Sequence, residues 1–282
     1  MKRQSFAVRY RPKTFNDIVE QDAIKARLVE QIKTNTVKQG YLFTGPSGCG
    51  KTPAARIFAN DINEGKGNPI ELDAASNNSV EDIRQIISNA KRKSLDSEYK
   101  VYILDEVHML STGAWNALLK LLEEPPAGVV FIMCTTDPQK IPPTILSRVQ
   151  RYDFSRISLD SIIDRLKYIL EEENLNIIDE NGGTQDSVVD IEWAIKEGIP
   201  IITYQEEAIQ YIAKMANGGM RDAITMMDTC LSLENNLTIE NVVKSLGTVD
   251  YNIHFELLYQ LAVLSPQRSV EIIEQVYNSG KE

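Results

Sequence analysis

The first half of the chain alternates short apolar runs with amphipathic stretches. Candidate strands lie at 41–44, 70–73, 101–105 and 129–134. The runs at 101–105 and 129–134 are almost continuously apolar, which is typical of strands buried on both faces of a parallel sheet. Between them, apolar residues recur at helical spacing over 80–93 and 113–124. This alternation predicts an α/β fold in which helices cover a parallel sheet.

After Phe154 the pattern is helical. Apolar residues recur at helical spacing over 159–173, 206–217, 221–232, 239–246, 251–264 and 266–278. We therefore expect an α/β domain at 1–158, a small all-helical domain at 159–245 and a further helical region at 246–282.

The segment 176–202 follows neither pattern. It carries six acidic residues and one lysine, together with Gly182–Gly183 and the apolar stretch 199–202. It adds about 25 residues to a connection, well beyond ordinary loop lengths, so we treat it as an insertion. One interpretation is a solvated excursion at the surface, and the alternative is an element that binds a partner.

Composition narrows the class of protein. The chain has 282 residues, a net charge of −10 and 43% hydrophobic residues, as in ordinary soluble proteins. No apolar run approaches the ~20 residues that span a bilayer, and the N-terminus lacks an apolar signal region, so we expect a cytoplasmic protein. Cys49, Cys134 and Cys230 are scattered, which argues against a disulfide scaffold or a zinc site. The negative charge argues against strong nonspecific DNA binding by the chain alone.

The stretch GPSGCGKTP at 45–53 carries the strongest chemical signal. It follows a predicted strand and fits the pattern of a phosphate-binding loop. The glycines allow backbone N–H groups to point at phosphate oxygens. Lys51 is expected to reach the β- and γ-phosphates of ATP, and Thr52 to ligate Mg²⁺. The predicted nucleotide-binding residues are Gly45, Pro46, Ser47, Gly48, Cys49, Gly50, Lys51, Thr52 and Pro53.

Pro53 occupies a position where a backbone N–H would help to hold the α-phosphate. Proline has no N–H but suits the first turn of a helix, so we expect the fold to accept it. A charge-assisted hydrogen bond contributes about 1.5–3 kcal/mol, so ATP affinity is expected to fall about ten- to hundredfold. We interpret the site as tuned or weakened, not inactive.

Asp105 and Glu106 stand at the end of the predicted strand 101–105. Asp105 is expected to hold Mg²⁺, and Glu106 to polarise the water that attacks the γ-phosphate. An Asp-Glu pair can also simply end a strand, but a phosphate loop on the same sheet favours the catalytic interpretation. The predicted activity is ATP hydrolysis, with ATP and Mg²⁺ as cofactors.

An ordered series of motifs resembles the AAA+ clamp-loader ATPases. It comprises 9–12, 17–19, the phosphate loop, 105–110, 122–126, 135–140 and 146–148. The chain is most similar to the gamma/tau subunits of bacterial DNA polymerase III, with related phage subunits as an alternative. The resemblance covers nearly the whole chain except the insertion. It implies a P-loop AAA+ ATPase domain at 1–158, a helical lid at 159–245 and the start of an oligomerising collar at 246–282.

The resemblance also assigns roles to single residues. Thr136 matches the polar residue that contacts the γ-phosphate or the attacking water. Arg148 matches the arginine finger that reaches the ATP of a neighbouring subunit in trans, and Arg221 matches the lid arginine that senses nucleotide state. A four-cysteine zinc module usual in these proteins is missing, so no zinc is expected. The residues expected to pack around adenine are Tyr10, Arg11, Pro12, Ile18 and Val19.

DNA contact is expected from the turn and helix that follow the strand 70–73, again by the resemblance. The candidate residues are Ser76, Asn77, Asn78, Ser79 and Arg84. Small polar residues at a helix N-terminus suit phosphate binding. They are equally ordinary helix caps, with Glu81 or Asp82 completing a local cap.

The leading hypothesis is an ATP-driven motor subunit of a clamp loader. In a pentameric open ring with other clamp-loader subunits, ATP binding opens a sliding clamp, and primer–template DNA triggers hydrolysis and release. No membrane partner is expected. The alternative is a non-hydrolysing stator subunit of the same ring that donates Arg148. A third reading, another AAA+ machine such as a branch-migration helicase, is disfavoured by the motifs at 9–12 and 135–138.

Overall fold

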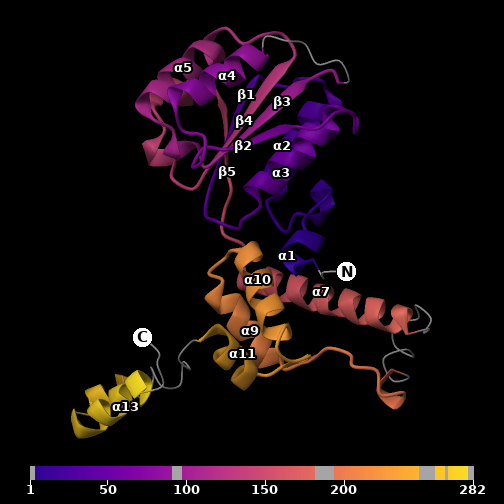
Figure 1. Ribbon diagram of the computed structural model, residues 1–282, viewed down its shortest axis with the longest axis vertical. Helices are drawn as coiled ribbons and strands as arrows, with labels where there is room; N and C mark the ends of the chain where they lie inside the picture. The colour runs from indigo at the N-terminus through magenta and orange to yellow at the C-terminus, as the bar shows by residue number, and fades with distance from the viewer. Residues whose placement is uncertain (1–3, 91–96, 182–193, 248–257, 264–265, 279–282) are drawn as a thin grey trace. The chain divides into compact units, whose positions relative to one another are not determined.

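The computed structural model describes residues 4–90, 97–181, 194–247, 258–263 and 266–278. It forms two compact units, whose chain segments can be followed in Figure 1. The sheet unit consists of Val8–Ile162 and Asn217–Asp222, and the helical unit of Met1–Ala7, Ile163–Ala216 and Ala223–Glu282.

A five-stranded parallel sheet with the order β2-β3-β4-β1-β5 forms the centre of the sheet unit. Its strands are β1 (Gly40–Thr44), β2 (Ile70–Asp73), β3 (Lys100–Asp105), β4 (Val129–Thr135) and β5 (Gln150–Asp153). Thr44 lies opposite Thr135, and Asp73 opposite Asp105. The carboxyl ends of the strands therefore meet at one edge, which is where ligands bind in open α/β sheets.

The predicted parallel sheet is confirmed, and β5 is the strand that the pattern missed. Along β5 only Tyr152 is buried, and its neighbours Arg151 and Asp153 are exposed. A single buried side chain gives no apolar run, so only the pairing with β1 identifies this edge strand.

Helices cover both faces of the sheet (Figure 1). They are α2 (Asp22–Lys33), α3 (Lys51–Asp61), α4 (Val80–Ala90), α5 (Thr112–Glu123) and α6 (Pro143–Leu146), with 3₁₀ turns η1 (Phe15–Asp17), η2 (Val107–Met109) and η3 (Pro138–Lys140). Alternate strand residues enter different cores, as the pleat requires. Phe43 and Ile103 pack with Phe58 of α3, whereas Leu42 packs with Leu118 of α5. The two cores hold the sheet, and hence the site at its edge, in place.

Helices make up most of the helical unit. They are α1 (Phe6–Arg9), α7 (Leu159–Glu180), α9 (Glu206–Met215), α10 (Met220–Leu231), α11 (Ile239–Leu246) and α13 (Pro266–Asn278). Three of them, α1, α7 and α10, cross the boundary between the units. The helical expectation is confirmed with one addition. The two-residue strands β6 (Thr203–Tyr204) and β7 (Asn236–Leu237) pair in parallel. None of the described helices is long and apolar enough to cross a membrane.

The segment 176–202 is described at its two ends, and 182–193 lies outside the described residues. Helix α7 extends to Glu180 and buries Ile178, so it runs beyond the predicted end at 173. The other end of the segment returns to α7, because the buried side chain of Asn174 forms hydrogen bonds with the backbone of Ile202. Of the predicted helix 251–264, only 258–263 falls within the described residues.

Candidate nucleotide-binding site

The loop between β1 and α3 curls tightly over the carboxyl edge of the sheet. Gly45, Gly48 and Gly50 have φ angles of 144°, 71° and 102°, a region that side chains disfavour. A Cβ atom at Gly48 would also lie 3.0 Å from the Cα of Gly219. This is the compact curl that the phosphate-loop pattern predicts.

Lys51, the first residue of α3, points its ammonium into this loop. The residue is 6% exposed. Nζ donates hydrogen bonds to the carbonyl oxygens of Gly45 and Pro46, at 2.9 and 2.7 Å. Among the residues that the structure describes, no carboxylate lies within ion-pair distance of this ammonium. A buried cation held only by loop carbonyls fits an anionic ligand such as phosphate.

Pro53 is the third residue of α3, and the helix continues through it to Asp61. The first helical hydrogen bond runs from the Ala54 N–H to the Gly50 carbonyl at 2.9 Å. Proline at this place therefore removes no hydrogen bond of the helix, because the first N–H groups have no partner within it. The expectation that the fold accepts Pro53 is confirmed.

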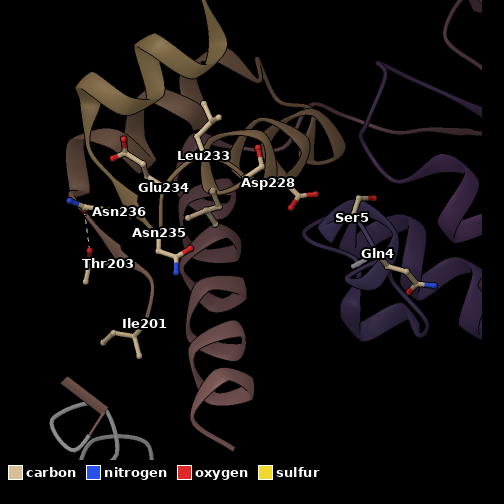
Figure 2. A pocket seen from close by; sticks show the side chains of 11 residues that line it. Gln4, Ser5, Ile201, Thr203, Asp228, Leu233, Glu234, Asn235 and Asn236 are labelled. Atoms are coloured by element: carbon tan, nitrogen blue, oxygen red, sulfur yellow. Dashed lines mark hydrogen bonds between the residues drawn. The ribbon is translucent and has the colours of Figure 1, made fainter. Parts of the chain in front are cut away.

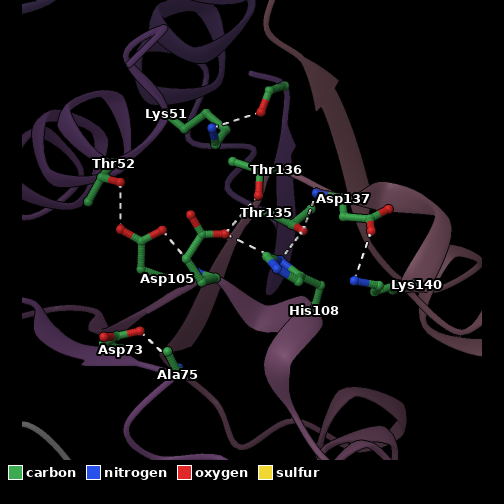
Figure 3. A network of polar contacts seen from close by, with 12 residues as sticks. Lys51, Thr52, Asp73, Ala75, Asp105, His108, Thr135, Thr136, Asp137 and Lys140 are labelled. Atoms are coloured by element: carbon green, nitrogen blue, oxygen red, sulfur yellow. Dashed lines mark hydrogen bonds and ion pairs between the residues drawn. The ribbon is translucent and has the colours of Figure 1, made fainter. Parts of the chain in front are cut away.

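Thr52 and Asp105 meet beside the loop (Figure 3). The Thr52 hydroxyl donates to Asp105 Oδ2 at 2.7 Å. A hydroxyl and a carboxylate are the hard oxygen ligands that Mg²⁺ takes in nucleotide sites, so this pair fits the predicted metal role. The described residues contain no group of three or more His, Cys, Asp or Glu side chains that could hold a metal ion.

Glu106 follows Asp105 in a left-handed conformation, with φ 48° and ψ 43°. This turn lets the Glu106 N–H donate to Asp105 Oδ1 at 3.0 Å. Its Oε2 atom accepts a hydrogen bond from the Thr136 hydroxyl at 3.1 Å. The structure thus brings the predicted base and the predicted sensor together across neighbouring strands.

His108 also contacts Glu106, and the sequence reasoning gave it no role. Its Nδ1 atom lies 3.2 Å from Glu106 Oε2 and 3.0 Å from the hydroxyl of Thr135 (Figure 3). The only local signal was its place in the motif 105–110. The partner Thr135 is 27 positions away along the chain, so only the fold reveals the contact.

Residues 217–222 of the sheet unit lie against the phosphate loop. The Met220 N–H donates to the Gly48 carbonyl at 3.1 Å. This contact places Arg221 next to the loop. Burial, followed by the nearby charges of Arg56 and Arg221, lowers the pKa of Arg11. Like charges gathered in this way are suited to an anion.

The adenine candidates lie before α2. Ile18 is buried in the core, at the distance of van der Waals contact from a Cβ built on Gly50, so it lies beside the loop. The Tyr10 ring faces the Arg9 guanidinium at 5.5 Å. Tyr10, Pro12 and Val19 are partly exposed, and Arg11 is exposed. Their contact with adenine stays a prediction.

Comparison of the whole sequence with known proteins points to one family. The chain is 36% identical to the DNA polymerase III subunit tau of Bacillus subtilis, over 97% of this chain and 48% of that protein. It is 31% identical to the DNA polymerase III subunit gamma of Buchnera aphidicola from Schizaphis graminum, over 100% of this chain and 76% of that protein. The chain belongs to the DNA polymerase III gamma/tau family.

A family model described as "DNA polymerase III, delta subunit" matches residues 70–158. The chain spans about half, or less, of the length of the tau relatives from Bacillus subtilis and Escherichia coli, 48% and 43%. A solved structure of the Thermotoga maritima RuvB Holliday junction branch migration motor shares the fold, with a TM-score of 0.60 over 90% of this chain and 80% of that one. At 17% identity this likeness concerns the fold alone.

Arg148, which the gamma/tau resemblance assigns as a finger, lies away from the loop of its own chain. It follows α6 and pairs with Glu123 at the end of α5, at 2.7 Å. It also donates to the Thr144 carbonyl at 2.6 Å. Arg148 lines a cavity of about 480 Å³ together with Lys38, Gln39 and Pro125.

The DNA candidates form a turn and a helix cap. Asn77 donates to the Asp73 carbonyl through its N–H and its side chain, at 2.9 and 3.0 Å. Ser79 and Asp82 cap α4 reciprocally, with Ser79 Oγ 2.7 Å from Asp82 Oδ2 and the Asp82 N–H 3.2 Å from Ser79 Oγ. Glu81 instead pairs with Arg84 at 3.3 Å. The capping role is therefore filled by Asp82, and DNA contact by Ser76, Asn78 and their neighbours stays a prediction.

A separate cavity of about 930 Å³ lies in the helical unit and contains none of the predicted site residues (Figure 2). The two carboxylates that line it, Asp228 and Glu234, accept hydrogen bonds from other parts of the helical unit. Asp228 accepts a hydrogen bond from the Phe6 N–H at 3.1 Å, and Glu234 accepts one from the Asn241 side chain at 2.7 Å.

Proposed function

We propose that this chain is an ATP-dependent motor subunit of a DNA polymerase sliding-clamp loader. The observation that carries the proposal is the grouping of Lys51, Thr52, Asp105 and Glu106 at one edge of the sheet, in a member of the gamma/tau family. A subunit that only supported the ring would have no need of all four.

Each residue has a definite task in this proposal. Lys51 would hold phosphate oxygens in place of its two loop carbonyls, and Thr52 and Asp105 would hold Mg²⁺. Glu106 accepts a proton from the attacking water, while the Thr136 hydroxyl donates a hydrogen bond to one carboxylate oxygen of Glu106. Bound MgATP supplies the phosphoanhydride bond and the charge neutralisation at the phosphates.

Arg148 acts on a neighbouring subunit. Its present partners lie at the end of α5 and on α6, so the guanidinium is available at the surface of the sheet unit at the cost of one half-exposed ion pair. We therefore propose a pentameric open ring with other clamp-loader subunits. The ring acts on a sliding clamp and on primer–template DNA.

Pro53 supports the second candidate, a stator subunit that donates Arg148 without hydrolysing ATP. It lacks the N–H that would hold the α-phosphate. The remaining catalytic groups favour the motor over the stator.

The test is ATP turnover during clamp loading onto primed DNA, by a complex reconstituted with the wild-type chain or with Glu106→Gln. Because a general base contributes about 10²–10⁴-fold, ATP turnover should fall by that factor in Glu106→Gln while MgATP binding persists. Equal turnover by both complexes, combined with loss of turnover on Arg148→Ala, would establish the stator instead.

A further inference from the structure

His108 occupies a polar contact that the nucleotide chemistry alone does not explain. It belongs to η2, the short turn after Glu106, and its side chain is 12% exposed. A single atom, Nδ1, faces both Thr135 Oγ1 at 3.0 Å and Glu106 Oε2 at 3.2 Å. The geometry joins the predicted base to the end of β4 through an imidazole (Figure 3).

Thr135 is more deeply buried than its two partners. It is fully buried at the end of β4, and its hydroxyl oxygen accepts a hydrogen bond from the Asp137 N–H at 3.0 Å. It is therefore part of the rigid frame of the sheet. His108 links Glu106, whose side chain is 38% exposed, to this buried threonine.

The position of the imidazole proton follows from the acceptors. A carboxylate that acts as a base accepts hydrogen bonds and donates none. A proton on Nδ1 lets this atom donate to Glu106 Oε2, with the Thr135 oxygen as a second acceptor. An Nε2–H tautomer would place two lone pairs against each other at 3.2 Å.

We propose that His108 is a positioning residue for the Glu106 carboxylate. With Thr136 it places two donors on Oε2, which leaves Oε1 as the oxygen that takes the proton of the attacking water. The inference rests on the proposed hydrolytic function. The competing interpretation is a histidine whose hydrogen bonds only satisfy its burial.

Long-range ¹H–¹⁵N NMR spectra of the imidazoles test the contact without any turnover. The chain contains two histidines, so the signals lost in His108→Asn belong to His108. We expect Nδ1 to be protonated in the full chain at neutral pH. An unprotonated Nδ1 would overturn the proposal, whatever the chain does with ATP.

Steady-state ATP hydrolysis by the assembled complex tests the function with a matched pair of variants. In His108→Asn the amide nitrogen is bonded to Cγ, as Nδ1 is, whereas in His108→Gln it lies one bond farther out. Because misplacing a catalytic group can cost about a hundredfold, we expect kcat to fall about ten- to hundredfold in His108→Gln and His108→Ala. His108→Asn should restore kcat to within about threefold of wild type, with KM little changed in all three.

Two substitutions of Thr135 form a second matched pair of variants. Thr135→Val keeps the shape but removes the hydroxyl, and should lower kcat, whereas Thr135→Ser should keep kcat near the wild-type value.

Equal kcat for His108→Asn and His108→Gln would overturn the proposal and make His108 a structural residue. Faster ATP turnover in either variant would also overturn it, because the contact would then restrain Glu106. A wild-type complex that neither binds nor hydrolyses ATP would refute the proposed function and not the contact, which the NMR spectra test separately.

Discussion

Two buried polar side chains, Lys51 in the sheet unit and Asn174 in the helical unit, are satisfied in different ways. Asn174 is 8% exposed, and both ends of its amide are hydrogen-bonded to the backbone of Ile202, with Nδ2 2.9 Å from the carbonyl oxygen and Oδ1 2.7 Å from the backbone nitrogen. Lys51 is 6% exposed and carries a charge, yet its partners are the carbonyls of its own loop.

The difference separates a structural polar group from a functional one. A buried amide with both sides matched needs no further ligand and serves to tie two segments together. A buried ammonium without a counter-ion among the described residues is expensive, and the cost is recovered when an anion binds. Burial alone therefore does not mark a site, whereas the nature of the partners does.

Arg148→Ala should produce the largest effect, and it tests whether the catalytic site needs an arginine from a neighbouring chain. An arginine finger contributes about 10³–10⁵-fold, so ATP turnover by the assembled complex should fall by at least about a thousandfold. MgATP affinity of the separate chain should not change. The matched control is Arg151→Ala, which removes an arginine in an exposed ion pair with Asp153; turnover lost equally in both variants would contradict a finger role.

Pro53→Thr should tighten MgATP binding about ten- to hundredfold, since it restores one N–H donor worth about 1.5–3 kcal/mol. Calorimetry on the full chain measures the change. Stability should change little, because Pro53 removes no helical hydrogen bond. Unchanged affinity would show that the loop does not use this donor.

Asn174→Ala should act on stability and not on nucleotide binding. It leaves the buried N–H and carbonyl of Ile202 unpaired, at about 1–3 kcal/mol for each unsatisfied group. Urea unfolding should therefore show a loss in the free energy of unfolding, with the MgATP affinity retained. Asn176→Ala, an exposed position on the same helix, should change the free energy of unfolding by less than about 0.5 kcal/mol. Equal losses would mean that the contact with Ile202 contributes nothing.

Glu20→Gln should have the smallest effect and depend on pH. Hydrogen bonding with the Ser158 side chain, together with its N–H at 3.0 Å, lowers the pKa of Glu20 from 4.5. A lowered carboxyl pKa adds stability above the unfolded value and loses it as the pH falls through the folded value. The difference in unfolding free energy between wild type and variant should thus be present at neutral pH and vanish in acid. A difference that persists in acid would rule out the charged contact.

Much of the fold was readable because the apolar pattern is local. The runs at 101–105 and 129–134 became β3 and β4, and the regular spacing after 159 became helices. The strand β5 was not readable, since Gln150, Arg151 and Asp153 are polar and the strand exists through its pairing with β1. Likewise, α7 runs past its predicted end because Ile178 is buried by the fold.

The site residues that lie in short motifs were also predictable, whereas the contacts between distant residues were not. Lys51, Thr52, Asp105 and Glu106 follow from short motifs, whose spacing along the chain reflects local geometry. The contact between His108 and Thr135 joins residues 27 positions apart, and the two motifs that contain them do not reveal that they meet. The pairing of Arg148 with Glu123 depends in the same way on how α5 and α6 pack.

A calorimetric titration of MgATP into the full chain, wild type beside Lys51→Ala, tests the central claim most directly. The buried ammonium of Lys51 predicts saturable binding in the micromolar range by the wild type and its loss in Lys51→Ala. Asn176→Ala serves as the folded control. Binding that survives Lys51→Ala, or a wild-type chain that does not bind MgATP, would contradict the account of this loop as a phosphate site.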